Sequence, residues 1–224
     1  MARTKALAKV LLDFDGTVTV KDTVDAILEC FAAPAWREIE EEWKRGEIGS
    51  RECLAKQTAL IRASPEEIDA LIDGIEIDPG FDEFVAACKR LNIGVTIVSD
   101  GYRRSIERVL QRAGHALPSR SGVLTYEGRR RWKLESPVSR ADCSSDSNTC
   151  KCMVANEAGV PKILVGDGRS DFCVANEADL VFAKGALLDH CVENGIEHRP
   201  IAGLSGAARL LGEFAARMDA KRAA

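Results

Sequence analysis

The stretch Val10-Leu11-Leu12-Asp13-Phe14-Asp15-Gly16-Thr17 joins an apolar run to two acids, a glycine and a threonine. A short apolar run that ends in acids and glycine is typical of a buried parallel strand that opens into a loop at its carboxyl end. Acids two residues apart point to the same side while the chain stays extended. We therefore expect a strand up to Leu12, followed by a loop that presents the carboxylates of Asp13 and Asp15 together.

Other apolar runs along the chain have the same form. They are predicted as strands at 93–98, before Ser99-Asp100-Gly101, at 162–165, before Gly166-Asp167-Gly168, and at 180–182. Helical patterns separate them at 81–91, 102–113, 148–158 and 171–178. This alternation predicts an α/β fold with a doubly wound parallel sheet. Such sheets bind ligands at the carboxyl ends of their strands, where the three polar clusters are expected to meet.

The segment 20–78 interrupts the alternation with consecutive helical patterns at 22–31, 35–45, 50–62 and 65–73. The last begins with Ser64 as N-cap and Pro65 in the first turn. We expect 1–19 and 79–224 to form the core domain and 20–78 to form a helical cap subdomain over the site; the alternative is a helical bundle without a catalytic role. Residues 123–134, around Glu127-Gly128, predict a β-hairpin, and 204–224 predict an amphipathic helix.

Composition narrows the class of protein. The chain has 224 residues, of which 46% are hydrophobic and 29% charged, an ordinary globular balance. A net charge of -4 argues against a nucleic-acid binder, and no apolar stretch approaches the ~20 residues that span a bilayer. With no secretory leader visible, we expect a cytoplasmic protein whose eight cysteines are reduced.

The acids of the first loop predict a metal site. Two carboxylates in one small site repel each other unless a cation or a shared proton separates them, and Mg²⁺ prefers oxygen ligands. A carboxylate that faces a metal-held phosphoryl group can attack it, while a second acid protonates the leaving oxygen. Ser99, Lys151 and the backbone of Gly101 can supply donors to a phosphate, and Asp167 and Asp171 can complete the metal shell.

The order of these elements resembles the haloacid dehalogenase superfamily of phosphohydrolases. The matching motifs are Asp13-Phe14-Asp15-Gly16-Thr17, Ser99-Asp100-Gly101, Lys151 and Gly166-Asp167-Gly168-Arg169-Ser170-Asp171, within roughly residues 8–185. The resemblance implies Asp13 as nucleophile, Asp15 as general acid and base, and Mg²⁺ held by Asp13, the Asp15 carbonyl, Asp167 and Asp171. It also implies Ser99, Asp100, Gly101, Lys151 and Gly168 around the phosphate. The partner is then a small phosphorylated metabolite.

The cap resembles that of the phosphoserine-phosphatase-like branch. There an acid after the first motif and a cap arginine bind the amino-acid part of phosphoserine. Asp22 falls at the acid position, whereas Gln57 stands at the arginine position, with Lys56 and Arg51 close in sequence. This departure counts against phosphoserine as substrate.

A further likeness is to the methionine-salvage phosphatases that act on 2-hydroxy-3-keto-5-methylthiopentenyl-1-phosphate. It rests on Ala33-Pro34-Ala35-Trp36, Ile48-Gly49-Ser50-Arg51-Glu52, Ala178-Asp179-Leu180-Val181-Phe182-Ala183-Lys184, Gly195-Ile196-Glu197-His198 and cysteines around the motif lysine. These matches imply that compound as a possible substrate, and they fix a substrate less firmly than the core motifs fix the chemistry.

Several features have two interpretations. Cys143, Cys150 and Cys152, with Asp142, could bind zinc, but they lack paired C-x2-C spacing, which favours reduced thiols in a loop. The basic run 129–131 is expected to be a solvated face, although it could attract anions. Tyr102, Arg103 and Arg169 could line the pocket or the surface. Trp36 and Trp43 share a helix face and favour core packing over substrate stacking, and the three histidines are expected to be structural.

Other functions are compatible with parts of the pattern. A phospho-receiver module also uses a strand-end Asp, a Ser or Thr and a Lys, but it has no helical insertion and no role for Asp15. A regulatory protein on the same scaffold would not need every catalytic position to be filled, as they are here. A phosphotransferase would pass the phosphoryl group to an acceptor other than water, and the sequence leaves that alternative open.

Overall fold

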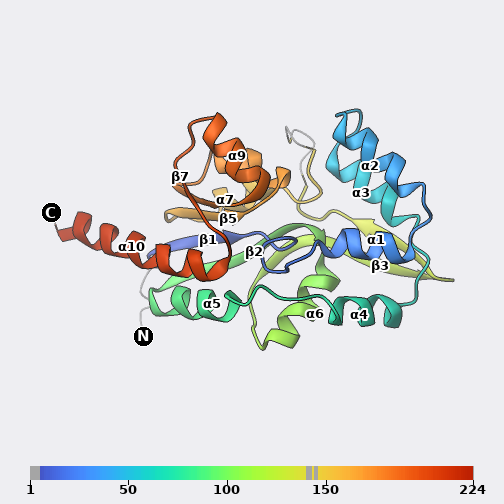
Figure 1. Ribbon diagram of the computed structural model, residues 1–224, viewed down its shortest axis with the longest axis horizontal. Coiled ribbons are helices and arrows are strands. Elements are labelled where there is room, and N and C mark those ends of the chain that lie inside the picture. Colours follow the sequence, from blue (N-terminus) through green and yellow to red (C-terminus); the bar gives the residue numbers. More distant parts are fainter. Residues whose placement is uncertain (1–5, 140–142, 144–145, 224) are drawn as a thin grey trace.

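The computed structural model describes residues 6–139, 143 and 146–223. Within these residues, seven strands form one sheet in the order β4-β3-β2-β1-β5-β6-β7 (Figure 1). The strands are β1 (Ala8–Leu12), β2 (Ile93–Tyr102), β3 (Ser119–Gly128), β4 (Arg131–Glu135), β5 (Lys162–Gly166), β6 (Leu180–Ala183) and β7 (His198–Pro200). Only the β3–β4 hairpin is antiparallel; the other neighbouring pairs are parallel. The predicted doubly wound α/β fold is confirmed.

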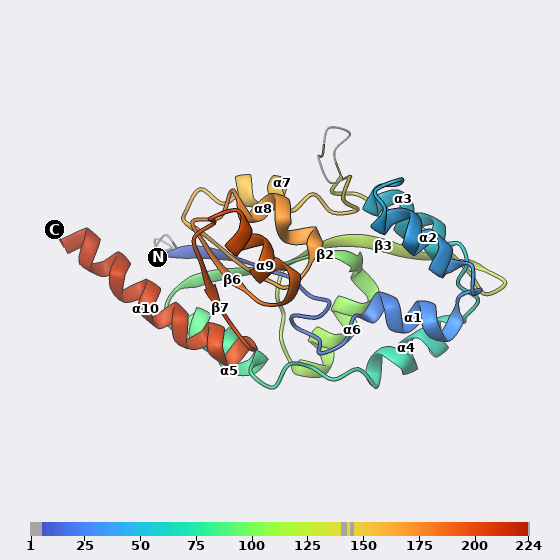
Figure 2. The same cartoon turned by 45° about the horizontal axis from the view of Figure 1, so that its top comes forward.

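Helices cover both faces of the sheet. One face carries α7 (Lys151–Asn156), α8 (Phe172–Ala175) and α9 (Gly185–Glu193), and the other carries α5 (Phe81–Arg90), α6 (Arg103–Ala113) and α10 (Leu204–Ala223) (Figure 2). Strand β1 is therefore buried on both sides: Leu11 packs in one apolar cluster and Leu12 in the other. This explains why its sequence is a continuous apolar run rather than an alternating one.

The order of the strands positions the site. The chain builds β1, β2 and β3 outward in one direction and then returns to place β5 on the opposite side of β1. The loops that follow β1 and β5 consequently diverge to opposite faces, which leaves a crevice at the carboxyl ends of these two strands. Asp13 and Asp167 each follow directly on one of these strands.

The segment after β1 forms the four predicted helices, α1 (Thr23–Phe31), α2 (Trp36–Lys44), α3 (Ser50–Thr58) and α4 (Pro65–Asp73) (Figure 1). Helix α4 is joined to α6 by charged pairs, including Arg104 with Asp69 at 2.7 Å and Arg108 with Asp73 at 2.5 Å. Helices α2 and α3 pack against each other. The buried hydroxyls of Thr58 and Tyr102 lie 2.8 Å apart and connect α3 to β2.

Some predicted boundaries were wrong. Strand β2 continues through the motif to Tyr102, because Tyr102 still pairs with Gly122 after an irregularity in register. Helix α7 begins at Lys151 rather than at residue 148, because the preceding residues bond to Asp100 instead. Helix α3 ends at Thr58 rather than at residue 62, and the hydroxyl of Ser50, its first residue, accepts a hydrogen bond from Trp43.

Strand β7 and helix α9 were not predicted from the sequence.

Among the described residues no helix combines the length and apolarity that crossing a bilayer requires.

Candidate active site

Asp13 lies at the carboxyl end of β1 with only 6% of its surface exposed. Its N–H donates to the Val165 carbonyl at 2.9 Å, which extends the pairing with β5 by one residue. The Nζ of Lys151 lies 2.8 Å from Oδ1 of Asp13 and 2.6 Å from Oδ1 of Asp171. Residues that are far apart in sequence therefore form one buried cluster of two carboxylates around an ammonium group.

Lys151 is 1% exposed. Burial by itself would lower the pKa of this ammonium group, but the charges of Asp13, Asp171 and Asp100 outweigh that cost and hold the pKa above its ordinary value. Lys151 is therefore a permanent cation beside the oxygen of Asp13. A cation at this position can stabilise negative charge that develops near the Asp13 carboxylate.

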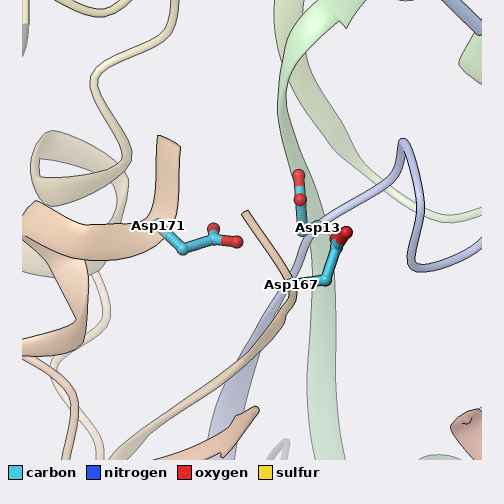
Figure 3. A group of neighbouring side chains, drawn as sticks. All are labelled: Asp13, Asp167 and Asp171. Atoms are coloured by element: carbon cyan, nitrogen blue, oxygen red, sulfur yellow. The ribbon is translucent and has the colours of Figure 1, made fainter. Parts of the chain in front are cut away.

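Asp13, Asp167 and Asp171 bring one carboxylate oxygen each within 4.8 Å of one another, and their side chains converge on the same space (Figure 3). Burial, followed by the charge of Asp13, raises the pKa of both Asp167 and Asp171. Such crowding of acids is relieved by a cation with oxygen ligands. The donor set and its mutual repulsion both fit a hard divalent ion such as Mg²⁺.

Asp15 lies two residues further on and its carboxylate turns toward α1. Oδ1 accepts from the Thr23 N–H at 2.8 Å and from its hydroxyl at 2.6 Å, and Oδ2 accepts from the Ser99 hydroxyl at 3.2 Å. Burial raises the pKa of Asp15 to about 6, although these hydrogen bonds oppose the shift. A carboxyl group with such a pKa can exchange a proton near neutral pH.

The predicted phosphate-binding residues of β2 lie beside Asp15. The sequence suggested that the Gly101 N–H would be free to donate to a ligand. In this structure it already donates to the Ser99 hydroxyl at 2.9 Å. A Cβ at Gly101 would lie 2.4 Å from Oδ2 of Asp15, which explains the need for glycine there. Asp100 accepts from the Thr149 N–H at 2.9 Å and thereby holds the loop before Lys151, and burial raises its pKa to about 6.

A cavity of about 320 Å³ joins these groups to the helices of segment 20–78. Its core side includes Asp13, Asp15, Ser99, Asp100, Gly101, Asp167, Gly168, Arg169 and Ser170, and its helical side includes Asp22, Val24, Asp25, Glu40, Trp43, Ser50, Cys53, Leu54 and Gln57. The structure therefore brings the predicted residues Asp22 and Gly168 to the same cavity as Asp13. Lys151 and Asp171 do not line this cavity; the Lys151 ammonium group contacts both Asp13 and Asp171.

Asp22 has a second, structural role. Its Oδ1 accepts from the N–H groups of Val24 and Asp25, so that it is the N-cap of α1. Enclosure by protein, followed by the charges of Asp15 and Asp25, raises its pKa well above the ordinary value. Gln57 is buried, and its amide donates to Glu40 Oε2 at 2.9 Å.

Sequence reasoning missed residues that orient the acids. Thr23 holds Asp15, as described above, and the Thr17 hydroxyl donates to Asp167 Oδ1 at 2.7 Å. Asn148 donates to the Asp100 carbonyl at 2.6 Å. Thr17 belongs to the quoted motif, so its position was a usable signal. Thr23 and Asn148 have no local signal, because only the folded chain brings them to their partners.

The features with two interpretations are placed as follows. Trp36 is buried in the core, whereas Trp43 lines the cavity with the Arg169 guanidinium 5.1 Å from its ring centre. Tyr102 is fully buried, and Arg130 of the basic run pairs with Glu67 at 2.7 Å. Each histidine contacts its own local partner: His115 with Asp82, His190 with Phe172, and His198 with Ile196.

Cys143, Cys150 and Cys152 do not belong to a group of three or more metal-ligating side chains with suitable spacing among the described residues. None of the eight cysteines, all of which lie within the described ranges, takes part in a disulfide. The acids Asp13, Asp167 and Asp171 form the one group there with metal-ligand spacing. Asp142, the expected fourth ligand, lies outside the described residues.

Residues 10–176 match the family model described as haloacid dehalogenase-like hydrolase. The match covers both acidic loops, the Ser99 motif and Lys151, so it spans the whole cluster described above. The chain therefore belongs to the haloacid dehalogenase-like hydrolase family.

Particular relatives extend the likeness over most of the chain. A protein of Geobacillus kaustophilus, named 2-hydroxy-3-keto-5-methylthiopentenyl-1-phosphate phosphatase, is 31% identical over 85% of this chain and 89% of its own length. One of the same name from an Exiguobacterium species is 28% identical over 85% and 91%. Among solved structures, a phosphoserine phosphatase from T. onnurineus has a TM-score of 0.71 at 14% identity and covers 94% of this chain and 97% of its own. At that identity the structural likeness shows the shared fold.

Proposed function

We propose that this chain is a magnesium-dependent phosphomonoesterase that hydrolyses a small phosphorylated metabolite through an aspartyl-phosphate at Asp13. The observation that carries the proposal is the Asp13 carboxylate in the lining of the cavity, with the Lys151 ammonium 2.8 Å away and two further acids around it. This arrangement combines a nucleophile, a fixed cation and a metal-ligand set in one place.

In the first half of the reaction, an oxygen of Asp13 attacks the phosphorus and the bond to the ester oxygen breaks. Asp15 gives its proton to that oxygen, so the alcohol leaves neutral. In the second half, Asp15 takes a proton from water, the water oxygen attacks phosphorus, and Asp13 is released with inorganic phosphate. When bound by Asp13, Asp167, Asp171 and the Asp15 carbonyl, Mg²⁺ supplies positive charge to the phosphoryl oxygens.

The remaining assignments belong to the same proposal. Ser99 and Lys151 supply donors to the phosphate, Gly101 and Gly168 line the space beside it, and Asp100 positions the loop that carries Lys151. Residues 20–78 act as a cap subdomain on the core of 1–19 and 79–224, because their helices supply half of the lining of the cavity. The enzyme works on a small metabolite in the cytoplasm.

The names of the relatives suggest 2-hydroxy-3-keto-5-methylthiopentenyl-1-phosphate as the first substrate to test. That compound carries a hydroxyl group and a methylthio group and no carboxylate. The helical side of the cavity offers carboxylate acceptors together with the apolar side chains of Val24, Leu54 and Trp43, which suits such a molecule. Gln57, whose amide is engaged by Glu40, offers no charge to the carboxylate of phosphoserine.

A panel of phosphorylated metabolites, including this enolic ester and phosphoserine, tests the proposal through kcat/KM with Mg²⁺ present. We expect hydrolysis of small monoesters, with the enolic ester preferred to phosphoserine. Absence of phosphate release from every ester, p-nitrophenyl phosphate included, would refute the proposed activity.

A further inference from the structure

The helical side of the cavity has a strongly asymmetric charge. Asp22, Asp25 and Glu40 line it, and no lysine, arginine or histidine from the helices α1 to α4 is among the described lining residues. The only basic residue that lines the cavity in the described chain, Arg169, comes from the core side. Substrate groups that extend from the phosphate toward α2 therefore meet carboxylates rather than cations.

The basic residues of the same helices are engaged elsewhere. Lys44 lies 2.9 Å from Glu41, and Lys56 lies 2.8 Å from Glu52. The Arg51 guanidinium pairs with Asp146, outside the cavity lining. None of these three cations lines the cavity, and Lys44 reaches Asp25 and Glu40 only through its charge, from outside the lining.

Gln57 strengthens this asymmetry. Its Nε2 donates to Glu40 Oε2 at 2.9 Å and reaches the Trp36 carbonyl at 3.4 Å, and its side chain is 3% exposed. The neutral amide of Gln57 fixes the position of the Glu40 carboxylate but leaves its negative charge in place. An arginine or lysine at position 57 would neutralise that charge. Burial, followed by the charges of Glu40 and Glu29, raises the pKa of Asp25, while the charge of Lys44 opposes this shift.

We propose that Asp25 and Glu40 form a charge filter at the helical end of the cavity, which rejects phosphate esters whose alcohol part carries an anion and favours those with a cationic group. The filter acts on substrate selection and rests on the proposed phosphatase activity. Esters whose alcohol part is uncharged, such as the enolic ester named above, are hydrolysed with a kcat/KM between those of the cationic and the anionic esters. Repulsion between like charges in this cavity is enough to decide between esters of similar shape.

A ladder of three-carbon esters isolates charge from shape: propyl phosphate, 3-aminopropyl phosphate and 3-phosphonooxypropanoate. We expect kcat/KM to be about 100-fold higher for the amino ester than for the carboxylate ester, with propyl phosphate between them. Competitive inhibition of p-nitrophenyl phosphate turnover by each ester should give the same ranking. In Glu40→Gln the ratio should fall about tenfold, mainly because the carboxylate ester improves.

Glu38→Gln is the matched control, because Glu38 is exposed on the same helix and does not line the cavity. It should leave the ratio unchanged. A wild-type ratio near one, or a Glu40→Gln ratio equal to the wild type, would overturn the filter while propyl phosphate hydrolysis still supports the phosphatase. If none of the esters nor p-nitrophenyl phosphate is hydrolysed, the proposed function fails and the filter fails with it.

Discussion

The Nζ of Lys151 lies 2.8 Å from Oδ1 of Asp13, and both side chains are almost completely buried. A lone buried ammonium group would lose its charge, but the charges of Asp13 and Asp171 hold the pKa of Lys151 above its ordinary value. The pair consequently places a fixed cation beside the proposed nucleophile Asp13 and is also part of the buried interior of the protein. Activity and stability should depend on it together.

Lys151→Met should lower kcat by about three orders of magnitude and lower the free energy of unfolding by about 3 kcal/mol, because it leaves Asp13 and Asp171 without their cation. Urea unfolding at pH 7.5 and phosphate release measure the two effects. Lys89→Met, at an exposed position on α5, should change neither. A Lys151→Met protein as stable and active as the wild type would contradict the role of this pair.

Removal of the metal should silence the enzyme. We expect EDTA to abolish turnover of p-nitrophenyl phosphate and added Mg²⁺ to restore it, because the acids around Asp13 repel each other and the phosphate without a cation. Turnover that persists in EDTA would count against the metal site.

A substitution of Thr17 is a second test of the metal site, because Thr17 is not itself a proposed metal ligand. Its hydroxyl orients Asp167, so Thr17→Val should raise the Mg²⁺ concentration for half-maximal activity about tenfold. Thr125→Val, on the exposed side of β3, is the control and should not shift it. An unchanged Mg²⁺ requirement in Thr17→Val would show that this hydrogen bond does not position a metal ligand.

Asp15→Asn should slow both halves of the reaction, since the amide can neither donate the proton to a leaving alcohol nor accept one from water. With p-nitrophenyl phosphate, whose leaving group needs little protonation, the second half should become limiting. We therefore expect a burst of p-nitrophenolate followed by a steady rate at least ~100-fold below the wild type. A wild-type steady rate without a burst would rule out the proposed role of Asp15.

Thr23 is predicted to act through Asp15. Loss of its hydroxyl in Thr23→Val removes the 2.6 Å bond and should lower kcat about tenfold with little change in KM, while Thr23→Ser should retain most activity. Equal activities of the Val and Ser variants would show that the hydroxyl is not required to position Asp15.

The sequence predicted the fold and the catalytic cluster because both follow from local patterns. The apolar runs before Asp13 and Asp167 identify strand ends, and parallel topology brings strand ends to one edge of the sheet. The run before Ser99 identifies β2, although this strand continues to Tyr102. Boundaries were wrong where tertiary hydrogen bonds compete with helix or strand propensity, as at Asn148 and Thr149, which bond to Asp100.

Other residues of the site could not be predicted for a similar reason. The packing of α2 against α3 determines which face of α2 lines the cavity. Nothing in the sequence therefore distinguished Glu40 from its neighbours Glu38 and Glu42 as a lining residue. The hydrogen bonds from Thr23 to Asp15 could not be predicted without knowing the conformation of the turn after Asp15. Gln57 was identified from the resemblance, but its partner Glu40 only from the structure.

The covalent step at Asp13 is the central claim, and it can be tested directly. Wild-type enzyme and Asp15→Asn are mixed with a monoester in Mg²⁺, quenched, reduced with borohydride and mapped by mass spectrometry. An aspartyl-phosphate is reduced to homoserine, so we expect homoserine at position 13, enriched in Asp15→Asn and absent from Asp13→Asn, which should be folded and inactive. Homoserine at another aspartate, or turnover retained in Asp13→Asn, would contradict the account.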